Sequence, residues 1–579
     1  MAQRWPAPKV QPKLKQEDFD DAVKTNIEDF DMSVEEAVQS AVDEFKLQGY
    51  DMSCVVATSA GGDLAKHPVT LAVAALGEAG DEPSLLCSAC QHLAELLEAA
   101  SAGGPAALQE AAAVALKAGA LAAVLAAVRA AQRQAGQGAG VTALKAGLAA
   151  ARGLAAASLD LRDGFDSLGG ALLLLDLHRM LPSDMELQAG VAQLAACACL
   201  KDELNKEAVM EAGLPLAMLR LMARLTPDAP PLGVPGPGPP AAAATPSPAS
   251  PSSQPQDPAA QQGGAQSGVL RVGQQGGGQQ GEGQNGEGQQ GVGQQGGGQS
   301  GGWQQGGGAQ GPPDQLVVAA CALLRAVTTA DDERPRASKA FMNARLLGKQ
   351  HQALRVLLAL LRRLGSEERG DTAAAVLVTV RQLAANEEIC RDFSDEGGVA
   401  TCLHLISRLA GRHREAVRCG LAALRQLAHS DATKRLLAAR GAAPLLMKLV
   451  AAYHGDKDIA EPAVGLMANM TLRQPEVVHL CAEVGVIDWV LELMAAMPAS
   501  RGVQRSGCIL VRNMVVRTTE HRAAFLEKGA EALLRAAKQR HPKYCNDVGS
   551  AALRDLGLDH YGTMEEFCVG NAAEDEYDD

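Results

Sequence analysis

The sequence predicts an all-α, right-handed α-solenoid, and three observations support this fold class. Ala, Leu and Val supply most of the 47% hydrophobic content, whereas aromatic residues make up only 3%. Ala and Leu favour helices, and a core with so few rings suits closely packed helices better than a sandwich or barrel. A chain of 579 residues is too long for one compact core, but a stacked array packs each unit only on its neighbours. The third observation is an internal repeat.

The repeat is clearest in the C-terminal half, where a glycine opens each unit. An apolar helix follows each glycine, and a further helix then ends in a shared pattern, LRQL at 424–427 and VRNM at 511–514. Glycine can end a short helix and adopt the positive φ of a sharp turn. A short helix followed by two longer ones within about 44 residues is typical of armadillo repeats, with two-helix HEAT repeats as the alternative. The glycines are 44 residues apart: Gly397, Gly441, Gly485 and Gly529.

The N-terminal half repeats more loosely, with Gly119, Gly169 and Gly213 each opening an Ala/Leu-rich helix. Residues 226–313 are Pro/Ala/Ser-rich and then Gly/Gln-rich, with almost nothing apolar to bury, which predicts disorder. We interpret this stretch as a loop inserted between the second and third helices of one repeat. The expected organisation is a disordered N-terminus (1–16), an acidic helical motif (17–50), N-terminal repeats (68–225), the insert (226–313), C-terminal repeats (314–558) and an acidic tail (559–579).

The acidic motif predicts two short helices before the repeats. Phe19, Val23, Ile27 and Phe30 fall on one face of the first helix, and the second opens with a capping box from Ser33 to Glu36. The stretch EDFDDAVKTNIEDFDMSVEEAVQSAVDEFKLQGYDMS resembles the N-terminal signature of the armadillo repeat-containing protein 6 family. The resemblance implies an armadillo protein of poorly defined function. The Gln/Gly insert and the Ala-rich spacers depart from that family's pattern.

Charge and cysteine placement exclude several classes of partner. The net charge is −14, and residues 17–44 carry eleven acids against Lys24, which argues against nucleic-acid or anionic-membrane binding. Most cysteines sit inside Ala/Leu runs, as reduced buried thiols do, and the N-terminus has no apolar export signal. We expect a monomer in the cytoplasm, with the nucleus as a second compartment.

The sequence offers no set of residues that predicts catalysis. It contains no P-loop, HExxH or GxSxG string. Cys87 and Cys90, with His92 nearby, form a CxxC that lacks a second ligand pair at zinc spacing, so we interpret them as helix cysteines. We therefore expect no enzyme activity, cofactor or metal.

The remaining candidate site is the concave groove that third helices line in armadillo stacks. Resemblance to that class places an amide position at the groove centre, where amides could bond to an extended peptide backbone. An arginine usually precedes it, and Ala468 alone breaks that row. We expect these residues to share one solvent-facing wall of a non-catalytic scaffold that binds an extended peptide or a helix of a partner protein, with the arginines selecting an acidic or phosphorylated segment. The candidate groove residues are Arg325, Arg381, Gln382, Arg425, Gln426, Asn469, Arg512, Asn513 and Arg554, with Asp555 at the last amide position.

Three alternatives stay open at this stage. The arginines could pair with acids of the next repeat and only stabilise the stack. The acidic residues 17–44 and the tail could mask the arginines, or form a solvated acidic cap. The scaffold could serve as a transport or chaperone-like adaptor or as a regulatory subunit of an enzyme. Import receptors for basic signals carry Trp four residues before the groove Asn, where this chain has Val378, Ala422, Gly465 and Ile509, so that function is not expected.

Overall fold

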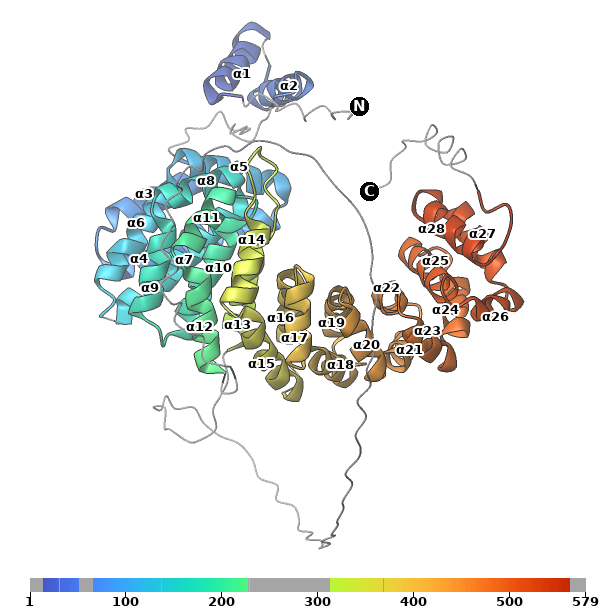
Figure 1. The fold of residues 1–579 in the computed structure, drawn as a ribbon. Coiled ribbons are helices and arrows are strands. Elements are labelled where there is room, and N and C mark those ends of the chain that lie inside the picture. The colour runs from blue at the N-terminus through green and yellow to red at the C-terminus, as the bar shows by residue number, and fades with distance from the viewer. Residues whose placement is uncertain are drawn as a thin grey trace, which may run out of the picture. The chain divides into compact units, whose positions relative to one another are not determined.

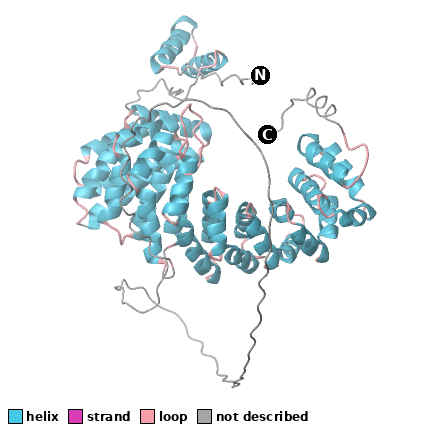
Figure 2. Cartoon of the chain, in the orientation of Figure 1, coloured by secondary structure: helices cyan, strands magenta, loops and turns pink. Residues whose placement is uncertain are grey.

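The computed structural model describes residues 14–30, 32–50, 66–136, 138–226, 229, 313–367 and 369–562. Every regular element in these residues is helical, as predicted (Figures 1 and 2). Most of the predicted N-terminal disorder (1–16), nearly all of the insert (226–313) and the acidic tail after residue 562 lie outside the described residues.

The described residues contain eight complete three-helix repeats, preceded by one repeat that has only its second and third helices. Three helices in each unit are typical of armadillo rather than HEAT repeats.

The first helices are α5 (Pro105–Lys117), α8 (Leu159–Ser167), α11 (Glu203–Glu211), α14 (Ala340–Arg345) with the π-helical turn η2 (Leu346–Gln350), α17 (Glu387–Asp395), α20 (Asp431–Ala439), α23 (Pro475–Glu483), and the 3-10 turn η3 (Thr519–His521) with α26 (Arg522–Glu527). The second helices are α3 (Pro68–Glu78), α6 (Ala120–Arg133), α9 (Gly170–Met180), α12 (Leu214–Leu225), α15 (Ala353–Ser366), α18 (Gly398–Leu409), α21 (Ala442–Ala452), α24 (Val486–Ala496) and α27 (Ala530–Arg540). The third helices are α4 (Pro83–Ala102), α7 (Gly138–Ala157), α10 (Met185–Cys199), α13 (Asp314–Ala326), α16 (Gly370–Leu383), α19 (Arg414–Leu427), α22 (Lys457–Thr471), α25 (Arg501–Val515) and α28 (Pro542–Asp555).

The repeats stack through two continuous rows of helices. Each third helix packs on the next, from α4 to α28, and each second helix packs on the next, from α3 to α27. Their apolar faces form one core of buried residues that runs from Val69 to Leu556. The 44-residue period therefore brings equivalent positions of neighbouring repeats side by side, which is what a solenoid requires.

The turn glycines take the backbone conformation that the repeat predicted. Each one precedes a second helix in the left-handed region, where a side chain would be strained. In the fifth repeat, Gln352 occupies this position with a φ of 52°. The seven glycines are Gly119, Gly169, Gly213, Gly397, Gly441, Gly485 and Gly529, with φ from 64° to 87°.

The acidic motif folds into a helical hairpin of α1 (Gln16–Phe30) and α2 (Val34–Leu47), with a small core of its own that includes Phe19 and Val38. The capping box is present: the Glu36 amide donates to Ser33 Oγ at 3.3 Å, and the Ser33 amide donates to Glu36 Oε2 at 3.2 Å. Phe30, expected on the buried face, is 65% exposed. The predicted apolar face of α1 is therefore wrong at this residue, which lies at the helix end beyond the small core.

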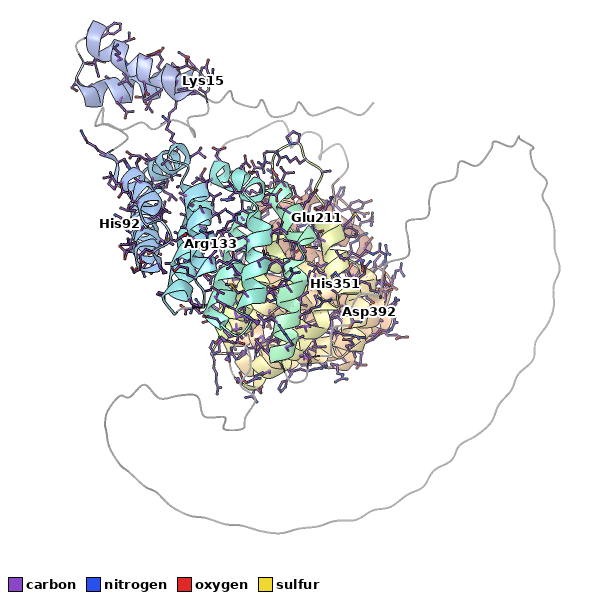
Figure 3. The ribbon with its side chains drawn as sticks, turned by 90° about the vertical axis from the view of Figure 1, so that its left-hand side faces the viewer. Lys15, His92, Arg133, Glu211, His351 and Asp392 are labelled. Carbon is purple, nitrogen blue, oxygen red and sulfur yellow. The ribbon has the colours of Figure 1, made fainter. Side chains whose placement is uncertain are left out.

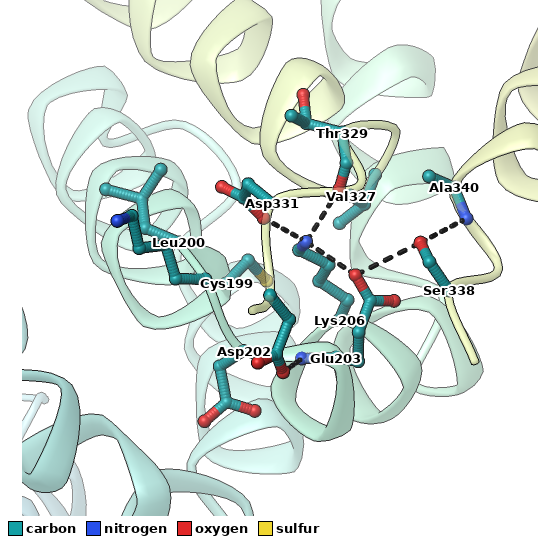
Figure 4. Close-up of polar contacts among 12 residues, drawn as sticks. Cys199, Leu200, Asp202, Glu203, Lys206, Val327, Thr329, Asp331, Ser338 and Ala340 are labelled. Carbon is teal, nitrogen blue, oxygen red and sulfur yellow. Dashed lines mark hydrogen bonds and ion pairs between the residues drawn. The ribbon is translucent and has the colours of Figure 1, made fainter. Parts of the chain in front are cut away.

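A buried ionic cluster joins α11 to the segment that follows α13, on the other side of the insert in sequence (Figure 4). Lys206 is fully buried, and its Nζ donates to Glu203 Oε1 at 2.8 Å, to the Thr329 carbonyl at 2.6 Å and to Asp331. Burial opposes the charge on Lys206, but the bonds to Asp331 and Glu203 outweigh it and raise the pKa of Lys206. We call Lys206 and these partners the clasp.

Arg334 extends the clasp. Its side chain pairs with Asp332 at 2.7 Å, with Asp163 of α8 at 2.5 Å and with Asp202 at 3.2 Å. The bonds from Arg334 hold the pKa of the Asp332 carboxyl well below its usual range. The clasp thus ties together chain segments that are separated by the whole insert, while α13 packs against both α10 and α12.

Side chains along the stack are shown in Figure 3, where His92 on α4 and Asp392 on α17 are labelled. The eleven cysteines in the described part of the chain are all free thiols, and most are buried. Among the same residues, no single helix is long and apolar enough to cross a membrane, although α5 and α6 pass that test as a pair bent by 67°.

Candidate protein-binding surface

The predicted groove residues lie in or next to the last turns of third helices, where the sequence pattern sets their exposure. In α19, Leu424 and Leu427 are buried in the core, so the two residues between them face outwards. Arg425 is exposed and Gln426 is half-buried. Because α16, α19 and α22 pack side by side, the equivalent residues form a strip across neighbouring repeats.

The amide row bonds to the stack itself. Each amide nitrogen reaches back to a carbonyl at or near the C-terminal end of the preceding third helix, where backbone acceptors lack helical partners. The four bonds are Gln382 to Thr328 O (2.7 Å), Gln426 to Ala384 O (2.9 Å), Asn469 to Arg425 O (3.1 Å) and Asn513 to Ala468 O (2.8 Å). These NH₂ groups therefore join consecutive repeats.

Asn513 departs furthest from the expected solvent-facing wall. It is only 7% exposed, because its bond to Ala468 O draws it between α22 and α25. Ala468, which replaces the arginine in this repeat, is itself buried. The sequence pattern located the amide position but not the direction of its hydrogen bond.

Three of the arginines have partners within the stack. Arg325 donates to the Ala375 carbonyl at 3.2 Å and to Thr379 Oγ1 at 3.4 Å, both on α16. Arg512 and Arg554 pair with the two oxygens of Asp555, at 3.1 Å and 2.8 Å. Arg512 therefore follows the alternative in which an arginine pairs with an acid of the next repeat and stabilises the stack.

Arg381 and Arg425 differ from the other three. Both are exposed, and neither has a hydrogen-bond or ion-pair partner among the described residues. Both line a hollow of about 740 Å³ over α16, α19 and α22. The Arg425 guanidinium lies against Gly465, where a Cβ atom would be 2.9 Å from its Cζ atom. Gly465 therefore provides the space that this arginine occupies.

The hollow contains further charged residues that the sequence analysis did not single out. Arg418 pairs with Glu415 at 2.5 Å and lowers the pKa of that carboxyl to about 2, and Asp458 pairs with Arg414 at 2.6 Å. The Glu461 carboxylate lies over Gly502, where a Cβ atom would be 1.9 Å from its Cδ atom. The charges of Arg418 and Asp458 are balanced by these ion pairs. The remaining charged residues that line the hollow are Arg381, Arg425 and Glu461, so the hollow has an excess of positive charge.

The other residues that line the hollow could have been found in the sequence from their helical spacing to the predicted groove residues. Ala422 and Arg418 precede Arg425 by three and seven residues, which puts all three on one face of α19. On α22, Glu461 precedes Gly465 by four residues and Asp458 precedes Asn469 by eleven, so these residues share one face of that helix. The hollow is thus a surface shared by three repeats.

The CxxC follows the prediction of helix cysteines. Cys90 is buried in α4, and burial raises the pKa of its thiol to about 12. A thiol that keeps its proton is a poor nucleophile and a poor metal ligand.

Comparisons with known proteins agree with the resemblance found in the sequence. Residues 11–74 match the family model described as the armadillo repeat-containing protein 6 N-terminal domain. A Drosophila melanogaster armadillo repeat-containing protein 6 homolog is 26% identical over 166 residues, which are 28% of this chain and 34% of the relative. The human armadillo repeat-containing protein 6 is 50% identical over 50 residues, 9% of this chain and 10% of the relative. The matches thus span about a third, or less, of the length of these curated relatives.

Among solved structures, a crystal structure of an engineered protein superposes with a TM-score of 0.55 at 14% identity, covering 94% of this chain and 95% of that one. At this identity the likeness concerns the fold alone. The resemblance is confirmed in the N-terminal segment: residues 11–74 are similar to the N-terminal domain of the armadillo repeat-containing protein 6 family, and an armadillo-type solenoid follows them.

Proposed function

We propose that the protein is a non-catalytic interaction scaffold that binds an extended acidic segment of a partner protein across α16, α19 and α22. The observation that carries this proposal is the pair Arg381 and Arg425, two exposed guanidinium groups without partners in the described residues, lining one hollow of about 740 Å³. The segment that they select is rich in carboxylates or carries a phosphate.

The chemistry of these arginines favours such a partner. A guanidinium presents a planar fork of donors that matches the two oxygens of a carboxylate or a phosphate. Arg512 and Arg554 bind the Asp555 carboxylate, and Arg325 donates to a carbonyl and a hydroxyl of α16. Arg381 and Arg425 keep their donors for another molecule. The excess positive charge in the hollow stands out on a chain whose net charge is −14.

The amide row limits what a bound peptide can use. Gln382, Gln426 and Asn469 each use one N–H donor on a carbonyl of the preceding repeat, so they offer a peptide backbone one remaining N–H donor and a carbonyl oxygen each. Affinity on this surface should therefore come mainly from charge-assisted bonds to acidic side chains. Such binding weakens as salt screens the exposed charges.

Fluorescence polarisation with three labelled peptides of one length tests the proposal. One peptide is Glu-rich, the second carries phosphoserine, and the third is Lys-rich. The full chain should bind the first two in low salt and bind the Lys-rich peptide at least roughly tenfold more weakly, since one hydrogen bond to a charged group contributes about 1.5 kcal/mol or more.

The variant pair Arg381→Glu and Arg425→Glu should remove most of this binding. The matched control is Arg391→Glu with Arg440→Glu, which changes the net charge equally at exposed positions on α17 and after α20. Equal binding by both double variants would refute the proposal, as would a preference for the Lys-rich peptide.

An adaptor and a regulatory subunit would both use this surface. The number of different partner proteins captured through it would separate these two functions.

A further inference from the structure

Two histidines and a glutamate from the last two repeats converge on the first-helix side of the stack. His479 lies on α23, and Glu520 and His521 form the end of the turn η3. Both α23 and η3 pack against α25, which holds them side by side. One ligand atom from each of the three side chains lies within 4.8 Å of the other two, and this is the one such group of three found in the described residues.

The spacing of these atoms fits a small metal ion. His479 Nε2 lies 3.5 Å from Glu520 Oε1. Two ligand atoms held about 2.1 Å from one tetrahedral ion are about 3.4 Å apart, so this pair needs almost no movement. The His479 and His521 rings are 5.4 Å apart between centroids, and a small side-chain rotation would complete the set.

His521 supplies a second, independent observation. Its Nε2 atom is buried and has no hydrogen-bond partner among the described residues. A buried polar atom without a partner costs free energy, and a metal ion or a water molecule is the usual explanation for one. In the neighbouring Arg522, one terminal guanidinium nitrogen lies 4.0 Å from where a Cβ atom would stand at Gly557, and Nε is also buried without a partner among the described residues.

The equivalent contact one repeat earlier, between α20 and the segment before α23, uses different residues. One period before His479 stands Arg435, which donates to Gln474 at 3.3 Å across the same kind of contact. An arginine and an amide make an ordinary hydrogen bond there and cannot bind a cation. A glutamate, Glu476, stands one period before Glu520, so it is the imidazole ligands that distinguish the contact between the last two repeats.

We propose that His479, Glu520 and His521 bind one divalent transition-metal ion of the zinc class. Two imidazoles with one carboxylate suit Zn²⁺ and its neighbours, whereas Ca²⁺ and Mg²⁺ prefer oxygen ligands alone. Three protein ligands leave a fourth position open to water. The ion ties α23 to η3, so it stabilises the contact between the last two repeats of the described residues.

Cobalt titration of the chelator-stripped full chain is the first test, because Co²⁺ takes zinc sites and reports its ligands by absorption. We expect one equivalent to bind with visible bands of nitrogen and oxygen ligation, and Zn²⁺ to displace it. A strong thiolate charge-transfer band would instead mean that cysteines took the ion, and this would overturn the assignment.

Variants separate this site from adventitious binding. The double variant His479→Ala with His521→Ala should lower Zn²⁺ affinity by more than roughly 100-fold, since loss of an outer-shell partner alone can cost that much. The matched control, His404→Ala with His454→Ala, removes two exposed imidazoles elsewhere and should bind normally. Equal Zn²⁺ affinity in the two double variants would contradict the proposal.

Hydrogen exchange provides a readout of the structural consequence. Saturating Zn²⁺ should slow amide exchange in η3, α26 and α27 of the wild-type chain and leave α15 to α18 unchanged. In the His479→Ala, His521→Ala variant, circular dichroism first verifies the helical fold, and Zn²⁺ should then have no effect on exchange. Zn²⁺ that binds the wild-type chain without protecting the last repeat would overturn the proposed role.

Discussion

Replacement of Lys206 by Met tests whether the clasp holds the two sides of the insert together. The Lys206 side chain is 1% exposed and makes three bonds, of which two reach the segment after α13. Without Lys206, the buried Glu203 carboxylate would keep only its 3.1 Å bond from Ser338 Oγ. Breaking a buried ion pair on one side costs about 3–5 kcal/mol, because the other charge stays buried.

The effect should appear locally, since stability in a stacked array is a sum over repeats and interfaces. Hydrogen exchange measured by mass spectrometry is therefore the assay. Amides of α11 and α13 should exchange on the order of 100- to 1,000-fold faster in Lys206→Met, while those of α21 and α24 keep their rates.

Two controls bound the result. Lys201→Met removes an exposed pair with Glu333, whose side chains are 56% and 85% exposed, and should change local stability by less than about 1 kcal/mol. Adding Glu203→Leu to Lys206→Met removes the stranded charge and should restore much of the lost protection. If Lys206→Met behaves like Lys201→Met, the clasp does not hold these segments and the reasoning fails.

Three further predictions concern single positions. Gly441→Ala should destabilise the chain by about 1–2 kcal/mol through its φ of 72° alone, because its Cβ would meet nothing, whereas Gly77→Ala, inside α3 with equal space, should be neutral or stabilising in thermal unfolding by circular dichroism. Gln352→Gly should stabilise the fifth repeat by about 1 kcal/mol, and a lower melting temperature would contradict the assigned strain. Asp332→Asn should lower the free energy of unfolding most at neutral pH, and the difference from wild type in urea unfolding should shrink as pH falls below about 4. A carboxyl with a depressed folded-state pKa contributes its full stability only above its unfolded pKa and loses it as pH falls toward the folded pKa; a pH-independent difference would contradict this.

The period in the sequence was enough to predict the repeat and its turns. Glycines at Gly397, Gly441 and Gly485 have a backbone requirement that few residues meet, so their positions carry direct information about φ. The capping box at Ser33 is similarly local, since its two bonds lie within four residues. Local chemistry of this kind can be predicted from one sequence.

Side-chain partners across repeats could not be predicted in the same way. The pattern places Arg425 and Arg512 at equivalent positions, but their surroundings differ because Gly465 lies under one and Asp555 beside the other. His479 and His521 are neither at equivalent positions nor close in sequence, and they meet where η3 begins the last repeat beside α23. These contacts depend on packing between helices.

The measurement that most directly tests the binding surface is site-specific photo-crosslinking of the Glu-rich peptide. A photoreactive residue at Ala422 lies in the hollow over α16, α19 and α22, and one at Ala451 lies exposed at the end of α21. The account predicts strong crosslinking at Ala422, little at Ala451, and loss of the Ala422 product in the Arg381→Glu, Arg425→Glu variant. Equal crosslinking at the two positions, or a product at Ala422 that survives both charge reversals, would contradict it.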